Sequence, residues 1–152
     1  MYERFIEEIG LGKGYLVRLL PGDDFFGTTA ELLREKALER GAFLSAIGSL
    51  VSVSYRNLRR GADLPITLNK TVLGEAAGPF ELLSLEGTFV PMEGEIRYNV
   101  HVMLGTEDAS VIGGHLLGAT VYTTVEMVIV ELGGSRVVKA ISDQTGLTEM
   151  EV

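Results

Sequence analysis

The chain has 152 residues, of which 46% are hydrophobic and 22% charged, so it is not a disordered chain and fits one domain over residues 1–152. Its formal charge of −8 repels a nucleic-acid backbone on average. The lack of cysteine excludes disulfides and thiolate chemistry.

The N-terminal segment carries acidic residues where a secretory signal would be basic and then apolar. Residues 2–9 fit either an edge strand or a short amphipathic arm. No stretch approaches the ~18 consecutive apolar residues that a membrane-spanning helix needs. We therefore expect a cytoplasmic protein with no membrane partner.

The first part of the chain predicts one strand and one helix. An apolar run at residues 14–20 ends in a Pro-Gly turn, which indicates a strand. Thr28 stands three residues before Glu31, the spacing of a capping box, and Gly41 could end a helix in the left-handed conformation. An amphipathic helix is expected over about residues 28–40.

The rest of the chain alternates apolar and polar residues in runs separated by turn residues, which is typical of strands. Gly48 predicts a bulge or a close backbone approach inside one of them. The tail after Asp143 is expected to dock or fray. The class predicted is α+β, a largely antiparallel sheet of about seven strands with one main helix. Besides residues 14–20, the expected strands are 42–56, 65–73, 80–89, 96–104, 121–132 and 136–141.

Both histidines lie between residues 78 and 126. Strand alternation places Asn99 and His101 on one face of their strand and the apolar residues between them on the other, core face. Gly113-Gly114, just before His115, could present backbone amides to an anion, but a tight turn or a bulge is the favoured interpretation.

Several motifs, in this order and spacing, resemble the plants-and-prokaryotes-conserved (PPC) domain over nearly the whole chain. They are residues 18–24, 78–87, 100–102 and 113–116, followed by Glu126. The resemblance implies an α/β fold on an antiparallel sheet of about seven strands, assembled as a homotrimer. In plants the domain follows an AT-hook that binds A/T-rich DNA. This sequence lacks the Arg-Gly-Arg-Pro core of the hook and is similar to the stand-alone prokaryotic members, whose biochemical role is unassigned.

The resemblance also implies a metal site of three histidines, but Asn99 replaces the first of them. His101 and His115 would need a carboxylate, Glu81 or Glu126, to complete a two-histidine, one-carboxylate set. The favoured alternative is that the histidines make structural hydrogen bonds at a subunit boundary. We therefore expect no resident cofactor, with zinc as the candidate for a weak or vestigial site.

Three functions follow from these observations. An oligomeric binding or scaffold module is favoured, because no nucleophile elbow, phosphate loop or dinucleotide fingerprint is present to indicate an enzyme. A metal-dependent enzyme or small-molecule binder would use a histidine cleft between subunits. A DNA-associated regulator would need a basic surface, for which Arg56, Arg59 and Arg60 are the candidates.

Overall fold

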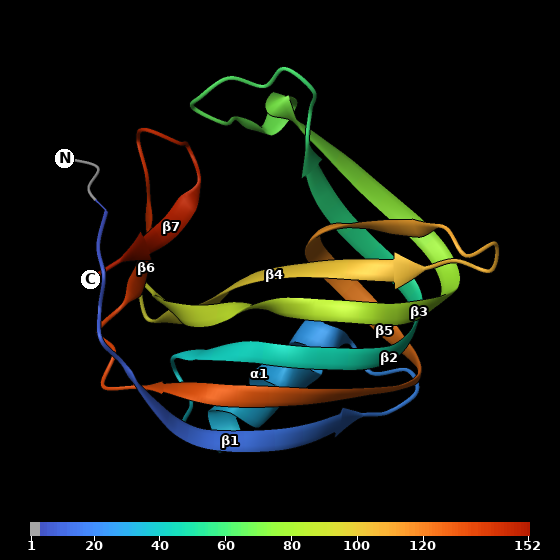
Figure 1. Ribbon diagram of the computed structural model, residues 1–152, viewed down its shortest axis with the longest axis horizontal. Helices are drawn as coiled ribbons and strands as arrows, with labels where there is room; N and C mark the ends of the chain where they lie inside the picture. Colours follow the sequence, from blue (N-terminus) through green and yellow to red (C-terminus); the bar gives the residue numbers. More distant parts are fainter. Residues whose placement is uncertain (1–3) are drawn as a thin grey trace.

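The computed structural model describes residues 4–152, and antiparallel strands make up most of it, with one helix packed on one side (Figure 1). The predicted fold class, an antiparallel sheet with one main helix, is confirmed. The strands are β1 (Gly10–Leu19), β2 (Gly41–Leu58), β3 (Thr71–Met92), β4 (Glu95–Gly105), β5 (Val111–Gly133), β6 (Val138–Ile141) and β7 (Thr148–Glu151). The helix α1 covers Phe25–Glu35, and a short 3-10 helix covers Leu68–Lys70.

Five strands form one sheet in the order β1-β5-β2-β3-β4, and β4 also pairs with β5. The extra pairing arises because β5 is 23 residues long: its first residues pair with β4, while its later residues pair with β2 and β1. Strands β2, β3, β4 and β5 thereby close into a small barrel. The hairpin of β6 and β7 is a separate two-stranded sheet at one end of the molecule (Figure 1).

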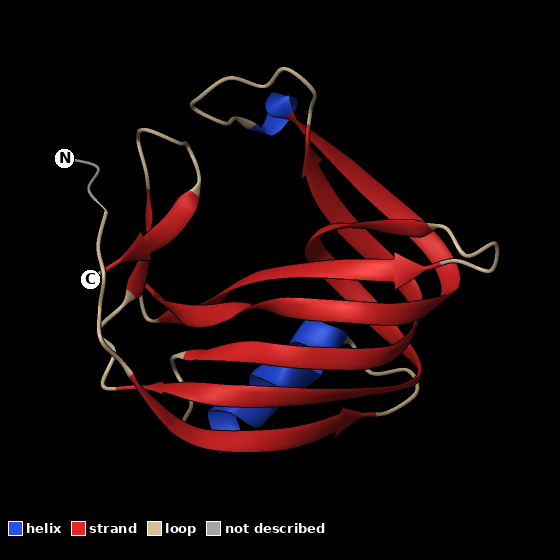
Figure 2. Cartoon of the chain, in the orientation of Figure 1, coloured by secondary structure: helices blue, strands red, loops and turns tan. Residues whose placement is uncertain are grey.

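The helix covers one face of β1, β5 and β2 and leaves the opposite face free (Figure 2). Its buried residues Phe25 and Leu33 join a core that includes Phe43, Phe89 and Ile129. The rings of Phe25 and Phe43 lie 6.0 Å apart between centroids. No helix in the described part of the chain is long and apolar enough to cross a membrane.

The helix begins and ends earlier than the sequence predicted. Asp24, not Thr28, is the N-cap, and its carboxylate accepts a hydrogen bond of 2.6 Å from the amide of Gly27. At the other end Ala37, not Gly41, adopts the left-handed conformation, with φ of 53°. The reason is the burial of Leu38, whose amide donates to the carbonyl of Leu33 in a Schellman-type ending that packs the two side chains together.

The strand pattern also differs from the prediction. Strand β5 begins at Val111 and not at residue 121, because its first residues pair with β4. Residues 65–70 form a loop with the 3-10 helix, so the predicted strand 65–73 is wrong, and its last residues begin β3. Strand β3 then runs without a break to Met92, because it pairs with β2 up to Leu82 and again from Gly87, and with β4 between these residues. The tail after Asp143 docks as β7. Residues 4–9 have no regular secondary structure, and the remaining residues of the predicted arm, 2 and 3, lie outside the described residues.

Candidate functional site

His101 and His115 face each other across neighbouring strands. They are register partners in the antiparallel pairing of β4 with β5, and their ring centroids lie 5.1 Å apart at an interplanar angle of 76°. Val100 and Val102 point into the core, as the alternation of β4 predicted, so His101 points outward. The closure of the barrel is what places the second histidine opposite the first.

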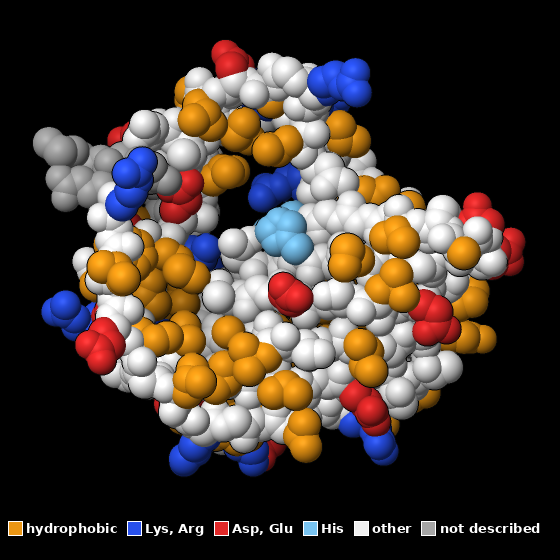
Figure 3. All heavy atoms as spheres, in the orientation of Figure 1, with side chains coloured by type: hydrophobic (Ala, Val, Ile, Leu, Met, Phe, Trp, Pro, Cys, Tyr) orange, Lys and Arg blue, Asp and Glu red, His pale blue; other side chains and the backbone are white. Residues whose placement is uncertain are grey.

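The two histidines line a hollow of about 950 Å³, which we call the histidine hollow, and lie beside its opening (Figure 3). One side of it is formed by the β6–β7 hairpin and the other by the end of β2. Asn99 lies in the same hollow, two residues before His101 on β4. The residues that line it are Arg56, Asn57, Leu58, Arg97, Tyr98, Asn99, His101, His115, Lys139 and Gly146–Met150.

The surroundings of His115 favour the neutral imidazole. Its pKa is lowered to about 4, first by burial and then by the electrostatic influence of Arg56, His101 and Lys139. A neutral imidazole has one nitrogen free to accept a hydrogen bond or to bind a metal ion. At neutral pH His115 is therefore a ligand or an acceptor and not a cation.

Gly113 and Gly114 form neither the predicted tight turn or bulge nor an anion-binding loop, because both lie within β5 and pair with β4 without a register shift. A Cβ on Gly113 would stand 2.2 Å from the carbonyl oxygen of Val102, and one on Gly114 would stand 2.3 Å from the amide oxygen of Asn57. The side-chain amide of Asn57 donates a hydrogen bond of 2.9 Å to the carbonyl of Gly113. The two glycines let β2 and β4 approach β5 closely just before His115.

The structure does not bring Glu81 or Glu126 to the histidines. Glu81 pairs with Gly105, four residues beyond His101, which is about 13 Å along a strand. Glu126 lies far along β5, where its carboxylate accepts hydrogen bonds from Arg18, the shorter of 2.7 Å. Both line a different hollow, beside Tyr122. Neither glutamate therefore lies where it could complete a two-histidine, one-carboxylate set with His101 and His115.

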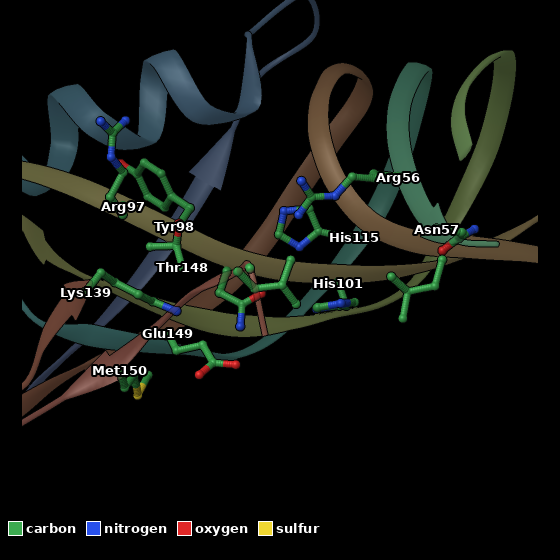
Figure 4. Close-up of a pocket in the computed structure, with 14 residues that line it drawn as sticks. Arg56, Asn57, Arg97, Tyr98, His101, His115, Lys139, Thr148, Glu149 and Met150 are labelled. Carbon is green, nitrogen blue, oxygen red and sulfur yellow. The ribbon is translucent and has the colours of Figure 1, made fainter. Parts of the chain in front are cut away.

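Four residues that the sequence did not place near the histidines lie close to them. Glu86 of β3 is the register partner of His101, and Arg56 of β2 is the partner of His115. Lys139 and Glu149 reach the hollow from the β6–β7 hairpin (Figure 4). Only the strand register and the docking of the hairpin bring them to the histidines, since all four are distant from both histidines along the chain.

The described residues do not complete a metal site. Within residues 4–152, no group of three or more His, Asp or Glu side chains is placed so that it could hold one ion. Glu86 is exposed, and its carboxylate accepts a hydrogen bond of 3.4 Å from Ser84. The histidine pair thus offers two ligands, whereas zinc in proteins takes three or four.

This chain is similar to known proteins in both sequence and structure. Among curated proteins, the chain is 32% identical over 143 residues to the bifunctional protein GlmU of a Synechococcus strain, covering 92% of this chain and 20% of GlmU. The chain thus spans about a fifth of the length of that relative. A solved structure of a metal-containing protein from Archaeoglobus fulgidus is 30% identical with a TM-score of 0.85, over 98% of this chain and 100% of the other.

Two further structures share the fold. A plant- and prokaryote-conserved (PPC) protein from Pyrococcus horikoshii has a TM-score of 0.81 at 22% identity, over 98% of this chain and 100% of its own. A protein from Ralstonia eutropha, provisionally named DNA-binding, has a TM-score of 0.76 at 20% identity, over 91% and 90% of the two chains. The model of the Plants and Prokaryotes Conserved (PCC) domain matches residues 7–133. That span contains every motif on which the resemblance rested, and the chain belongs to the Plants and Prokaryotes Conserved domain family.

Proposed function

We propose that this protein is an oligomeric ligand-binding module of the PPC family, and that its binding site is the histidine hollow. The observation that carries the proposal is the pair of facing imidazoles, 5.1 Å apart, in a hollow of about 950 Å³. A concave site of this size with a few polar groups at its base is typical of sites for small molecules. The hollow is also where the β6–β7 hairpin meets the barrel, so a ligand there would contact both.

A screen of small metabolites by thermal unfolding tests this proposal. We expect the ligands that raise the melting temperature of the wild type to have little effect on His115→Ala, because binding to the native state alone is what shifts the unfolding equilibrium. Glu126→Ala is the matched control, since Glu126 lies outside the histidine hollow. Ligands that stabilise His115→Ala as much as the wild type would place the binding site elsewhere.

Assembly into a homotrimer is the second part of the proposal. The face of β1, β5 and β2 that α1 leaves free carries exposed apolar side chains, among them Leu16 (89% exposed), Leu44 (55%) and Ile47 (56%). Figure 3 shows hydrophobic side chains gathered over these strands, on the same side of the molecule as the histidines. An apolar patch of this kind commonly marks a protein interface. A second copy of the chain would cover it and would bring a neighbour close to the histidine hollow.

A metal ion is a second candidate for the hollow. The related protein from Archaeoglobus fulgidus is metal-containing, and the two histidines of this chain could hold zinc as an incomplete ligand set. We propose weak binding only, because Asn99 stands where the family resemblance calls for a histidine. Restoring that histidine and measuring the zinc content tests the proposal.

Association with DNA is the weakest of the candidates. Proteins of the same fold are provisionally named DNA-binding, but this chain has a formal charge of −8. Of the candidate arginines, Arg56 lines the histidine hollow, and Arg59 donates to the carbonyl of Asn69. We expect no saturable binding to an A/T-rich duplex at about 150 mM salt in a gel-shift assay. Binding that is lost when Arg59 and Arg60 become alanine would contradict this expectation.

A further inference from the structure

The histidine hollow is more positive than the rest of the molecule. Arg56, Arg97 and Lys139 line it, against the single carboxylate of Glu149, although the chain as a whole has a formal charge of −8. Arg97 is paired with Glu95 at 3.5 Å. Arg56 and Lys139 make neither a hydrogen bond through their side chains nor an ion pair with any residue of the described chain. Two cations therefore remain available to a ligand.

Lys139 is the more informative of the two cations because it is only 6% exposed. It lies on β6, where its backbone pairs with Met150 of β7. Its ammonium group has no acceptor in the described chain, and the surrounding residues shield most of the side chain from water, so the charge is poorly solvated. Burial lowers the pKa of Lys139, and the charge of Glu149 opposes that shift only in part. Such a group is expected to have a partner that the chain itself does not supply.

Glu149 does not meet that need. One of its carboxylate oxygens accepts a hydrogen bond of 2.8 Å from Thr145, and the other is buried without a partner in the described chain. The ammonium of Lys139 is close enough to feel the charge of Glu149, yet the two groups form no ion pair within 4.0 Å. The hairpin presents an unused donor, and beside it an unused acceptor that could receive a hydroxyl or amino group of the same ligand.

Arg56 lines the same hollow, next to the histidines. It lies near the end of β2 as the register partner of His115, and Figure 4 shows its side chain beside His115, with Lys139 apart from it on the hairpin. The hairpin is held over the hollow by the loop before β3, where the amide of Ile66 donates a hydrogen bond of 2.6 Å to the carbonyl of Thr145. Ile66 is buried at this contact. Arg56 on β2 and Lys139 on the hairpin therefore line the hollow from two different elements. The hydrogen bond of Ile66 connects the hairpin to the loop between β2 and β3.

We infer that the histidine hollow binds a small organic or inorganic oxyanion, a carboxylate or a phosphate, held between Arg56 and Lys139 over the imidazoles. This inference rests on the proposed function, because it names the ligand class of the same hollow. Arginine and lysine are the side chains that recognise such anions, through charge-assisted hydrogen bonds. The volume of about 950 Å³ admits a metabolite larger than the anionic group itself.

Calorimetric titration of the full chain, with metal removed by a chelator, tests the inference. The probes are inorganic phosphate and succinate, and succinamide is the uncharged match for succinate. We expect the wild type to bind at least one of the two anions and not succinamide. Lys139→Met and Arg56→Gln should each weaken that binding by about tenfold or more, the loss expected for a charge-assisted hydrogen bond. Arg60→Gln, an exposed arginine outside the hollow, should leave the affinity unchanged.

Thermal unfolding gives a second readout that does not depend on measurable heats. In buffer without phosphate or carboxylate, Lys139→Met should melt at a higher temperature than the wild type, because it removes a poorly solvated charge that no residue of the described chain pairs with. Added anion should raise the melting temperature of the wild type only, so the melting temperatures of the two proteins should move closer together. The inference would be overturned if neither anion bound or stabilised the wild type. It would also be overturned if Lys139→Met and Arg56→Gln bound the anion as tightly as the wild type.

The proposed function can fail separately. Repeating the titrations after addition of zinc separates the proposed function from the ligand class. If neither anion binds but zinc binds the wild type and not His115→Ala, the hollow is still a binding site and only the anion is refuted. Anion binding that is lost in Lys139→Met supports both the hollow and its ligand class, whatever the result with zinc.

Discussion

Asn99 is the residue on which the metal question depends. It lies two residues before His101 on β4 and on the same face, inside the histidine hollow. We predict that wild-type protein purified without added metal contains well under one zinc ion per subunit. Asn99→His should raise the zinc content and the melting temperature in zinc, because a third imidazole adds a coordinate bond and the ion binds the native state. Elemental analysis by mass spectrometry measures the content.

Asn99→Gln is the matched control for this experiment, because it keeps an amide at the position and adds no imidazole. Its zinc content should equal that of the wild type. Stoichiometric zinc in the wild type that disappears in His101→Ala or His115→Ala would contradict the prediction and would make the hollow a working metal centre.

The lowered pKa of His115 predicts that the stability of the protein depends on pH. Burial and neighbouring cations lower its pKa from 6.5 to about 4 in the native state, whereas the unfolded chain keeps the ordinary value. Between these two pH values the unfolded state binds the additional proton, so the free energy of unfolding falls as the pH is lowered from about 7 to 4. Because the side chain is only partly buried, solvent screening reduces this contribution to about 1–2 kcal/mol.

The comparison of the wild type with His115→Gln isolates this contribution from that of the acidic residues. Urea unfolding in the presence of a chelator, at several pH values, should show a shallower decline for the variant. The prediction fails if the two proteins lose stability in parallel between about pH 7 and pH 4.

At the scale of the elements, Gly48 shows how the long strands bend. The sequence predicted a bulge or a close backbone approach at this position, and the structure confirms both: φ is +149°, the register with β5 shifts between Gly48 and Leu50, and a Cβ would stand 2.0 Å from the carbonyl oxygen of Thr124. Gly48→Ala should therefore lower the free energy of unfolding by about 2 kcal/mol or more. Urea denaturation followed by circular dichroism measures it.

Gly14 supplies the control, because it also lies in a strand but a methyl group added to its Cα would meet no atom within 4 Å. Gly14→Ala should change the free energy of unfolding by no more than about 0.5 kcal/mol. Equal losses for the two substitutions would mean that glycine is needed for strand flexibility in general and not for the contact with Thr124.

At the scale of the whole molecule, we predict a trimer of three chains of 16.4 kDa, about 49 kDa by light scattering. Leu44→Lys together with Ile47→Lys should lower the mass toward that of one chain, because two charges would then lie on the apolar face. Leu68→Lys changes an equally apolar residue that is 73% exposed on the 3-10 helix, away from this face, and should leave the mass unchanged. A monomer mass for the wild type at micromolar concentration would refute the trimer.

The sequence by itself determined the α+β class, the family, the turn after β1 and the face of each β4 side chain, because these depend on local periodicity and on motifs that lie within one strand or turn. It also singled out His101 and His115. It misplaced the ends of α1, where the burial of Leu38 selected the termination, and it split β3, where pairing with β2 outweighs the turn residues inside it.

Only the tertiary structure decided what surrounds the histidines. The closure of β4 on β5 sets His115 opposite His101, and the same register brings in Glu86 and Arg56 while leaving Glu81 and Glu126 in another hollow. The docking of the β6–β7 hairpin adds Lys139. A register shift of one residue would move every one of these strand side chains to the other face of the sheet. Such pairings between distant segments depend on the packing of the whole barrel, and no local pattern in the chain encodes them.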